Sequence, residues 1–442
     1  MKIREIITAS ALLLTLSATA QEESRTLREC LETGLENNYS LRIVRNREKI
    51  AENNTGWANA GMLPTATATA SYSGTLDNSN IEPRESGAST VSQRNVTDHT
   101  LRAGIDLQWL VFDGFKMQAN YQRLKELHLQ SQTQTRIAVE NFIANFTAEY
   151  YNYILQRLRL KNLSYAVKLS RERLRIVQDR YIIGNNSRLD LLQAQVDFNA
   201  DSAQSVKQNE QLQTSRIRLH ELMAERNVDN RFAVTDTIIY DDNRLDFDTL
   251  WQATLANNAE LILAAHNNSI AALDLKSVQS RDYPYVRLNA GYGYTHTRYD
   301  VNTTLNRSDW GADFGISVGF NLFDGKRSRQ RKNAKIEVIN AELEQQDLEL
   351  CLYADLNDLW QSYQNNKRLL ALERQNVIAA RENYDIAYER YLLGDLSGIE
   401  MREAQKSLLD AEDRILVAEY NTKLCEISLL QLSGNIGAYL NN

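Results

Sequence analysis

The chain has 442 residues, a formal net charge of −7 and 43% hydrophobic residues, and it contains only three prolines. Two stretches, 115–183 and 326–393, contain neither proline nor glycine. Because these two residues are the main breakers of regular structure, the composition predicts very long helices and excludes an ordinary loop-rich globular enzyme. The mixed, mildly acidic charge also lacks the dominant basic surface of a nucleic-acid-binding protein, so no nucleic-acid partner is expected.

Residues 1–20 have the features of a secretory signal peptide. Lys2 and Arg4 form a charged region, residues 6–16 form an apolar region, and residues 18–20 read A-T-A, an A-x-A cleavage site. We expect cleavage before Gln21 and export from the cytoplasm. No later apolar run reaches the roughly 18 residues of a membrane-spanning helix, and no Cys follows the cleavage site, so neither a helical span nor a lipid anchor is expected.

The mature chain is an internal duplication. Three motifs recur in the same order at an offset of 210–220 residues: L-x-N-N-x-x-L at 35 and 255, F-D-G at 112 and 323, and R-Y-x-x-G-x-x-S at 180 and 390. Such self-similarity indicates two copies of one structural unit. We therefore divide the chain into a first repeat at 21–229 with a β-hairpin at 64–112, a connector at 230–246, and a second repeat at 247–442 with a β-hairpin at 284–323.

Each predicted hairpin consists of two strands of about 10–13 residues with one apolar face, the length and pattern of a tilted transmembrane β-strand. The first strand begins at Thr65 with strict alternation of Thr and Ala. The apolar faces of the other three are Leu101, Ala103, Ile105, Leu107, Trp109 and Val111; Val286, Leu288, Ala290, Tyr292 and Tyr294; and Trp310, Ala312, Phe314, Ile316, Val318, Phe320 and Leu322.

The alternative to a membrane barrel is a soluble β-sandwich, which four strands in two widely separated hairpins fit poorly. Four strands cannot close a membrane barrel alone, because eight is the usual minimum. The chain must then oligomerise, and three copies would supply 4 × 3 = 12 strands. Loops 77–98 and 299–309 would lie at the extracellular side.

The two breaker-free stretches carry a seven-residue apolar repeat, which indicates supercoiled helices. At about 1.5 Å per residue each helix would be roughly 100 Å long, and its partners would be 26–60, 187–225, 247–281 and 397–433. The repeat positions are Phe146, Tyr153, Leu160, Val167, Leu174 and Tyr181, and Leu356, Tyr363, Leu370, Val377, Tyr384 and Tyr391.

Glycine and serine mark the predicted turns after the long helices. Gly184 and Gly394 are expected in the left-handed conformation that ends a helix. Ser187 and Ser397 are candidate N-caps, with Asp190 and Glu400 three residues later in a capping-box arrangement. A basic run, 326–335, is interpreted as the solvated start of the second long helix.

No motif for chemistry is present. The histidines His99, His128, His220, His266 and His296 are isolated, and no glycine-rich phosphate loop occurs. Cys30, Cys351 and Cys425 fit no metal-binding spacing, although one disulfide bridge is possible after export. We therefore expect no enzymatic activity, no cofactor and no metal.

Together, the duplicated R-Y-x-x-G-x-x-S, the duplicated F-D-G after a strand and the helix lengths resemble the outer-membrane efflux protein (TolC-like) family. The resemblance covers the whole mature chain. It implies an all-α plus membrane β-barrel fold: a trimeric 12-stranded outer-membrane barrel continuous with a long periplasmic α-helical barrel, with the connector in the equatorial region. It places the protein in the outer membrane of a Gram-negative bacterium, in contact with outer-membrane lipid.

The implied function is a passive exit duct of a tripartite efflux or type I secretion system. Its partners would be a periplasmic adaptor and a proton-driven or ATP-driven inner-membrane pump, and its cargo would be small molecules or polypeptides. The alternative, from a different class, is a periplasmic or secreted coiled-coil scaffold without a pore, which has no need of four apolar-faced strands.

The resemblance also implies site residues. The adaptor would dock at the tips of the two hairpins, at Ile183, Gly184, Asn185, Leu393, Gly394 and Asp395. The periplasmic gate would comprise Asp190, Tyr391, Glu400 and Glu403, with Tyr391 bonded to Asp190 and the two glutamates forming acidic rings. A gating Arg of other members is replaced here by Leu396, and Arg188 could substitute for it. Asp190 and Glu400 could instead be helix caps only, and Tyr391 could be heptad packing only.

Overall fold

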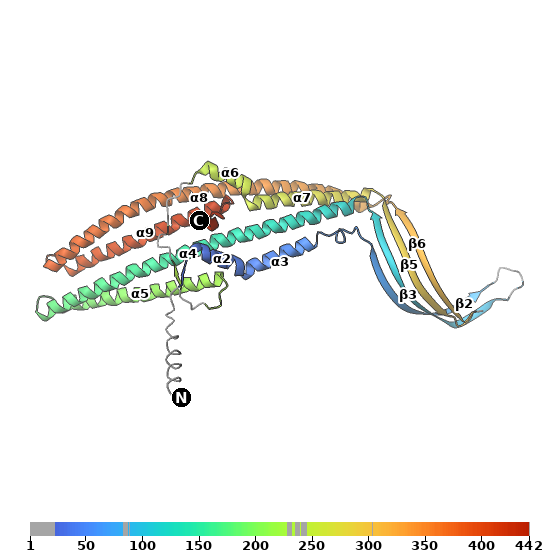
Figure 1. Ribbon diagram of the computed structural model, residues 1–442, viewed down its shortest axis with the longest axis horizontal. Coiled ribbons are helices and arrows are strands. Elements are labelled where there is room, and N and C mark those ends of the chain that lie inside the picture. Colours follow the sequence, from blue (N-terminus) through green and yellow to red (C-terminus); the bar gives the residue numbers. More distant parts are fainter. Residues whose placement is uncertain are drawn as a thin grey trace, which may run out of the picture. The chain divides into compact units, whose positions relative to one another are not determined.

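The computed structural model describes residues 23–82, 87, 89–227, 232–234, 239, 245–302 and 304–441 (Figure 1). The predicted signal peptide and most of the predicted connector lie outside these residues. The chain divides into two compact units. One comprises Arg47–Gln132 and Leu263–Gln346, and the other comprises the chain up to Asn46, Thr133–Ile262 and the chain from Asp347 onward. Each unit therefore combines segments of both repeats.

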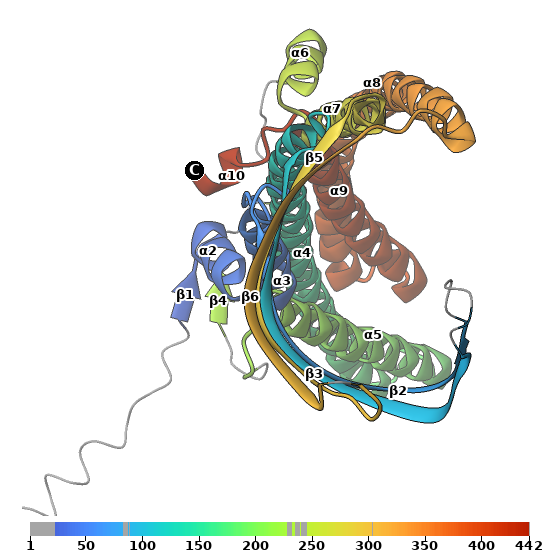
Figure 2. The ribbon, with the colours of Figure 1, turned by 90° about the vertical axis from the view of Figure 1, so that its right-hand side faces the viewer.

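The first of these units contains a four-stranded antiparallel sheet, strongly curved in Figure 2. Its strands are β2 (Thr65–Ile81), β3 (Val91–Phe112), β5 (Tyr285–Arg298) and β6 (Asn306–Gly319), in the order β2-β3-β5-β6. The central pairing of β3 with β5 joins the hairpins of the two repeats. The duplicated hairpins thus form one sheet, and β2 and β6 are its edges.

The strands are longer than expected, at 17, 22, 14 and 14 residues. β2 and β3 remain paired as far as Ile81 and Val91, beyond the last β3–β5 pair at His99 and Arg298. The predicted loop at 77–98 is therefore mostly strand, and the loop at 299–309 is shortened because β6 begins at Asn306. This extension lacks an apolar face, so periodicity could not reveal it. Phe320 and Leu322, predicted within the last strand, lie after its end.

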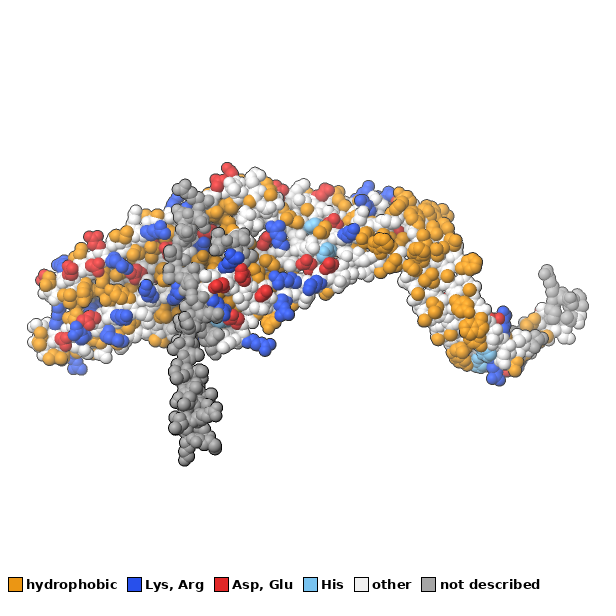
Figure 3. Space-filling model, viewed as in Figure 1, with side chains coloured by type: hydrophobic (Ala, Val, Ile, Leu, Met, Phe, Trp, Pro, Cys, Tyr) orange, Lys and Arg blue, Asp and Glu red, His pale blue; other side chains and the backbone are white. Residues whose placement is uncertain are grey.

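The predicted apolar face of the sheet is exposed. Phe314 is 91% exposed, and Figure 3 shows hydrophobic side chains gathered over the strands. In water this surface would be strongly unfavourable, since the hydrophobic effect is roughly proportional to the apolar area left in contact with solvent. Other exposed members of this face are Leu101, Ile105, Leu107, Trp109, Val111, Tyr292, Trp310, Ile316 and Val318.

Each F-D-G motif connects a strand to a long helix. Gly114 has φ +72°, and a Cβ atom there would lie 2.2 Å from the Ser280 carbonyl oxygen. The Asp113 carboxylate accepts a hydrogen bond from the Met117 N–H (3.1 Å) at the start of α4 (Lys116–Ile182). The first copy of the motif thus combines a left-handed turn, a close backbone approach and a helix cap, whereas Gly325 of the second copy has no positive φ, and a Cβ atom there would meet no atom closer than 3.9 Å.

The long helices are confirmed. α4 has 67 residues, and α8 (Gly325–Leu393) has 69. α5 (Arg188–Leu222) and α9 (Gly398–Leu432) return along them. None of the helices in the described ranges combines the length and apolarity needed to cross a lipid bilayer. The remaining elements are α2 (Leu27–Asn37), α3 (Tyr39–Asn53), α6 (Phe247–Asn257), α7 (Ala259–Gln279), the 3-10 turn η1 (Ser280–Asp282), α10 (Ala438–Asn441), and β1 (Glu23–Arg25) paired in parallel with β4 (Phe232–Val234).

The segments 26–60 and 247–281, expected to be single helices, are each divided at the second Asn of the L-x-N-N motif. The Asn38 side chain accepts a hydrogen bond from the Ser40 N–H (3.0 Å) and donates one to the Leu222 carbonyl (3.0 Å). Asn258 does the same with Glu260 (2.9 Å) and Leu432 (2.9 Å). The repeated motif therefore starts a new helix and ties it to the end of the returning helix.

The second heptad line is buried except at Val377, which is half-buried: Tyr363, Leu370, Tyr384 and Tyr391 are all 5% exposed or less. The first line differs, because Tyr181 is 40% exposed. Towards its end, α4 instead buries Ala166, Ser170, Arg173 and Val177. The reason is a second partner: Gln405 of α9 donates hydrogen bonds to Ala166 and Ser170, so this part of α4 packs against α9 as well as α5. No disulfide joins Cys30, Cys351 and Cys425.

Candidate functional site at the tips of the helical hairpins

Two equivalent turns connect α4 to α5 and α8 to α9, at the left end of Figure 1. Gly184 (φ +82°) and Gly394 (φ +87°) adopt the predicted left-handed conformation. The Asn185 N–H donates to the Arg180 carbonyl (2.8 Å) and the Gly184 N–H to the Tyr181 carbonyl (3.0 Å). The second turn repeats both bonds, with Asp395 and Gly394 as donors. This pair of bonds is the Schellman motif that satisfies the last carbonyls of a helix.

Gly184→Ala is expected to destabilise its turn by about 1–2 kcal/mol, the cost of a left-handed L-residue. No atom lies within 4 Å of the added Cβ, so the effect is purely one of backbone conformation. Gly398→Ala is the matched control, because that position also has open space but no positive φ. Hydrogen exchange at the turn amides measures both; equal protection in the two variants would contradict the expectation.

Both predicted capping boxes are confirmed. The Ser187 hydroxyl accepts the Asp190 N–H (3.2 Å), and the Asp190 carboxylate accepts the Ser187 N–H (3.0 Å). Ser397 and Glu400 form the same pair of bonds at 3.2 and 3.1 Å. The hydrogen bonds from Ser397 lower the pKa of the Glu400 carboxyl. Asp190 and Glu400 therefore fix the start of each returning helix, and Glu403 lies exposed one turn further on.

The turns present an exposed apolar surface, which we call the tip patch. Long aliphatic side chains next to both glycines point into solvent, although a buried core lies directly behind them. Leu396 packs against that core, whereas Arg188 is exposed and makes no ion pair in the described part of the chain. The tip patch consists of Ile182 (79% exposed), Ile183 (70%), Leu189 (75%), Leu393 (79%) and Ile399 (77%).

Tyr391 lies in this core and is 3% exposed. Its hydroxyl has no hydrogen-bond partner among the described residues, so the expected bond to Asp190 is not formed in this chain. Burial raises the pKa of the Tyr391 hydroxyl. The structure therefore brings Tyr391 into the tip core but leaves Asp190 bonded to its own helix cap.

Arg180 connects the two hairpins at this level. Its guanidinium donates hydrogen bonds to the carbonyls of Tyr391 and Leu392, both at 3.0 Å, and lies 5.1 Å from the centre of the Tyr391 ring. One arginine of α4 thus caps the end of α8. Sequence reasoning missed this role, although Arg180 is the first residue of the duplicated R-Y-x-x-G-x-x-S motif.

Further from the tip, buried charges join the hairpins. Asp201 of α5 is 4% exposed and accepts two hydrogen bonds from Arg402 of α9, at 2.7 and 2.6 Å. The Ser170 hydroxyl of α4 also donates to Asp201. One carboxylate is therefore held by three helices and by both repeats. The sequence offered no signal for it, because the partners are 201 residues apart.

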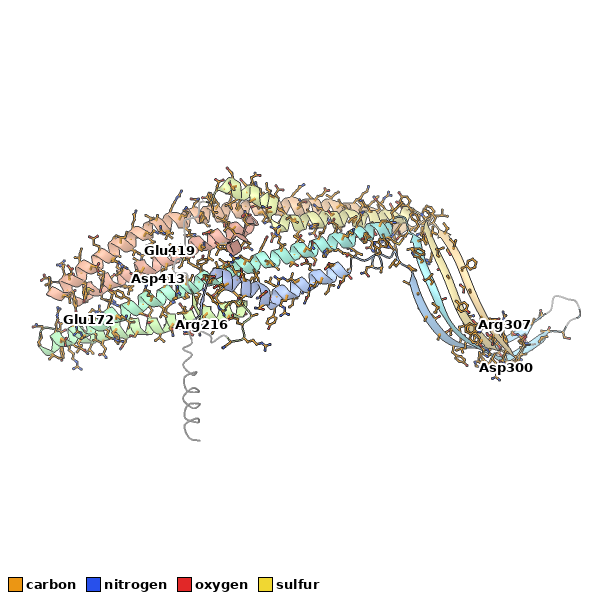
Figure 4. The ribbon with its side chains drawn as sticks, viewed as in Figure 1. Glu172, Arg216, Asp300, Arg307, Asp413 and Glu419 are labelled. Atoms are coloured by element: carbon orange, nitrogen blue, oxygen red, sulfur yellow. The ribbon has the colours of Figure 1, made fainter. Side chains whose placement is uncertain are left out.

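Two further ion pairs lie nearby. The buried Arg173 of α4 is paired with Asp197 of α5, and two of its guanidinium nitrogens have no other partner in the described chain. Arg159 binds Asp413, labelled in Figure 4, at 2.6 and 3.1 Å, on an exposed surface. Within the described ranges, no group of three or more His, Cys, Asp or Glu side chains could hold a metal ion.

Comparison with known proteins identifies this arrangement. The outer membrane efflux protein family model matches residues 30–225 and 250–435. The chain is 22% identical to outer membrane protein TolC of Vibrio cholerae over 97% of this chain and 94% of that protein. It is 21% identical to outer membrane efflux protein BepC of Brucella suis over 98% and 91% of the two chains. The Campylobacter jejuni CmeC outer membrane channel superposes with a TM-score of 0.76 at 16% identity, covering 92% of this chain and 85% of that one. The chain therefore belongs to the outer membrane efflux protein family.

Proposed function

We propose that three copies of this chain form a passive exit duct of a tripartite efflux or type I secretion system. The observation that carries the proposal is the sheet: four strands with an exposed apolar face and two unpaired edges, β2 and β6. Pairing β2 of one copy with β6 of the next would remove the edges and close a barrel of 4 × 3 = 12 strands. A scaffold without a pore leaves this apolar face unexplained.

The tip patch supports docking of a periplasmic adaptor. Its aliphatic side chains are 70–79% exposed, and a contiguous exposed apolar patch of this kind is typical of a protein–protein interaction site. The hydrogen bonds of the Schellman turns fix the backbone that carries these side chains. We propose that Ile183, Gly184, Asn185, Leu393, Gly394 and Asp395 receive the adaptor. An inner-membrane pump then supplies the energy, and the duct itself carries out no chemistry.

The assembly is tested by the mass of the purified protein in detergent and by channel activity in planar bilayers. A trimer that inserts and conducts is the expected result. A monomer that stays in the soluble fraction without detergent would refute the duct and favour the scaffold.

We propose that the tip is a gate, with Asp190, Tyr391, Glu400 and Glu403 at its narrowest part and Arg180 as its latch. Arg180→Gln should raise single-channel conductance, because it removes two hydrogen bonds to the end of α8. Lys168→Gln is the control, since Lys168 is an exposed cation of the same helix that lies outside the latch. Equal conductance of both variants and the wild type would exclude Arg180 as a latch.

Tyr391→Phe separates two versions of this gate. The variant keeps the ring beneath Arg180 and loses only the hydroxyl, which has no partner in the chain described here. Unchanged conductance would assign the latch to Arg180, whereas increased conductance would assign it to a Tyr391–Asp190 bond formed in the assembled trimer.

We further propose that Glu400 and Glu403 make the tip cation-selective, as charged rings do in pores. Glu403→Gln should lower the cation-to-anion permeability ratio, and Glu382→Gln, on the exposed surface of α8, should not. Because the folded pKa of Glu400 is lowered, its charge and its capping contribution are present above the ordinary value of 4.5 and are lost as pH falls through the lowered pKa. The cation-to-anion permeability ratio, measured between pH 7 and pH 3, should therefore fall as the pH is lowered through the pKa of Glu400.

A further inference from the structure

The first turns of α8 carry an unusual concentration of positive charge, which we call the basic collar. Residues 326–335 contain six Lys or Arg residues and no acidic residue. The segment immediately before it, 320–325, contains Asn321 and Asp324 but also three exposed large apolar side chains: Phe320 is 51%, Leu322 86% and Phe323 90% exposed. The basic collar is therefore continuous with the apolar surface of the sheet, and Figure 3 shows Lys and Arg side chains directly beside the hydrophobic surface of this unit.

Most of these cations form no ion pair with the residues that the structure describes. Arg327 and Arg331 share Asp282, at 3.1 and 3.2 Å. The other four cations are exposed and form no ion pair in the part of the chain that the structure describes: Lys326, Arg329, Lys332 and Lys335. An unpaired, concentrated charge gains nothing from the fold and is repelled by its own neighbours.

The first repeat shows that a strand-to-helix connection does not need these cations. The first ten residues of α4, 116–125, contain three cations, and two of them are engaged. Arg123 is paired with Asp274 (2.7 Å), and the Lys125 ammonium lies 4.5 Å from the centre of the Tyr121 ring. The duplicated F-D-G motif is present in both repeats, so the excess of unpaired cations is a property of the second repeat alone.

We propose that the basic collar binds the anionic headgroups of phospholipids in the periplasmic leaflet of the outer membrane. Lys and Arg side chains next to an apolar surface extend their charged ends to the level of the headgroups. The exposed residues Phe320, Leu322 and Phe323 would lie in the adjoining interface, where aromatic side chains are favoured. The proposal depends on insertion of the sheet in the outer membrane and is independent of the gate and the cargo.

The test measures lipid preference around the full-length protein reconstituted in phosphatidylcholine bilayers. Electron spin resonance of spin-labelled phosphatidylglycerol and phosphatidylcholine gives the relative association of each lipid with the protein. The wild type should prefer phosphatidylglycerol roughly fivefold, the factor that one cation near an anionic surface provides. The variant K326Q/R329Q/K332Q/K335Q should approach equal association of both lipids.

The matched control is K161Q/K168Q/K207Q/K406Q, which removes the same charge from exposed lysines of the helical hairpins. It should keep the wild-type preference. An equal loss in both quadruple variants, or no loss in the first, would overturn the proposal. Failure of the sheet to insert would give a different result, in which neither spin-labelled lipid is restricted by the protein.

Two measurements on the wild type do not depend on the stability of any variant. Raising the ionic strength with sodium chloride should weaken the preference, since exposed charges are screened within about 10 Å at 0.1 M salt. A preference that does not change with salt would refute an electrostatic headgroup site. Sodium phosphate at equal ionic strength should displace no more lipid than chloride; displacement by phosphate alone would indicate a site for the free anion and would overturn the lipid assignment.

Discussion

Asp201→Ala is expected to destabilise the packing of α5 against α9 by about 3–5 kcal/mol, the cost of removing one partner of a buried ion pair. Asp201 is 4% exposed, and without it the Arg402 guanidinium loses both of its short hydrogen bonds. Ser170 also loses its acceptor. Hydrogen exchange should show the loss as reduced protection of amides in α5 and α9, with smaller changes in α2 and α10.

Two controls separate burial from charge. Asp413→Ala breaks the pair with Arg159, in which the Asp413 side chain is 51% exposed and the Arg159 side chain 24% exposed. The loss should cost less than about 1 kcal/mol. The double variant D201L/R402M replaces the buried pair with apolar side chains and should recover most of the lost protection. Equal effects of Asp201→Ala and Asp413→Ala would show that burial of the pair is not what matters.

Phe314→Arg is expected to cost about 2–4 kcal/mol of membrane-inserted stability, the penalty for a cation on the lipid-facing side of a barrel near the bilayer midplane. Phe314 is 91% exposed on the apolar face of β6, so no packing within the chain is lost. The effect should appear as less assembled protein in outer-membrane fractions and as a lower denaturant midpoint for protein folded into lipid vesicles.

Gly315→Arg is the matched control for this substitution. Gly315 follows Phe314 in β6, so a side chain at Gly315 would point to the opposite face of the strand. No atom lies within 4 Å of a Cβ atom placed there. The control adds the same charge and volume, but on the face that a barrel would turn to its lumen. Similar losses in both variants would mean that the apolar face does not contact lipid.

Local motifs were the most reliable sequence signals. The glycine turns and the capping boxes at Ser187 and Ser397 follow from residue types that satisfy a nearby backbone group. The two long helices follow from the absence of breakers, and the strands follow from alternation. Where the signal was absent, the prediction was wrong: the polar ends of β2 and β3 continue as strands without an apolar face.

Contacts between distant segments were not predictable in the same way. The pairing of β3 with β5, the capping of α8 by Arg180 and the Asp201–Arg402 pair all join residues about 200 positions apart. A single charged residue on a helix has the same sequence signature whether it is solvated or buried against another helix. Likewise, the end of α4 buries Ser170 rather than the predicted heptad positions because α9 packs against it.

By itself, the sequence determined the duplicated order of elements, the length of the helices and the conformation of the turns, because these depend on interactions between near neighbours. Only the tertiary structure decided which charges are buried, which are shared between the hairpins and which remain unpaired beside the apolar sheet. Those outcomes depend on solvent exclusion and on partners brought together by folding, and the free energy of a charge changes far more with its surroundings than with its position in the chain.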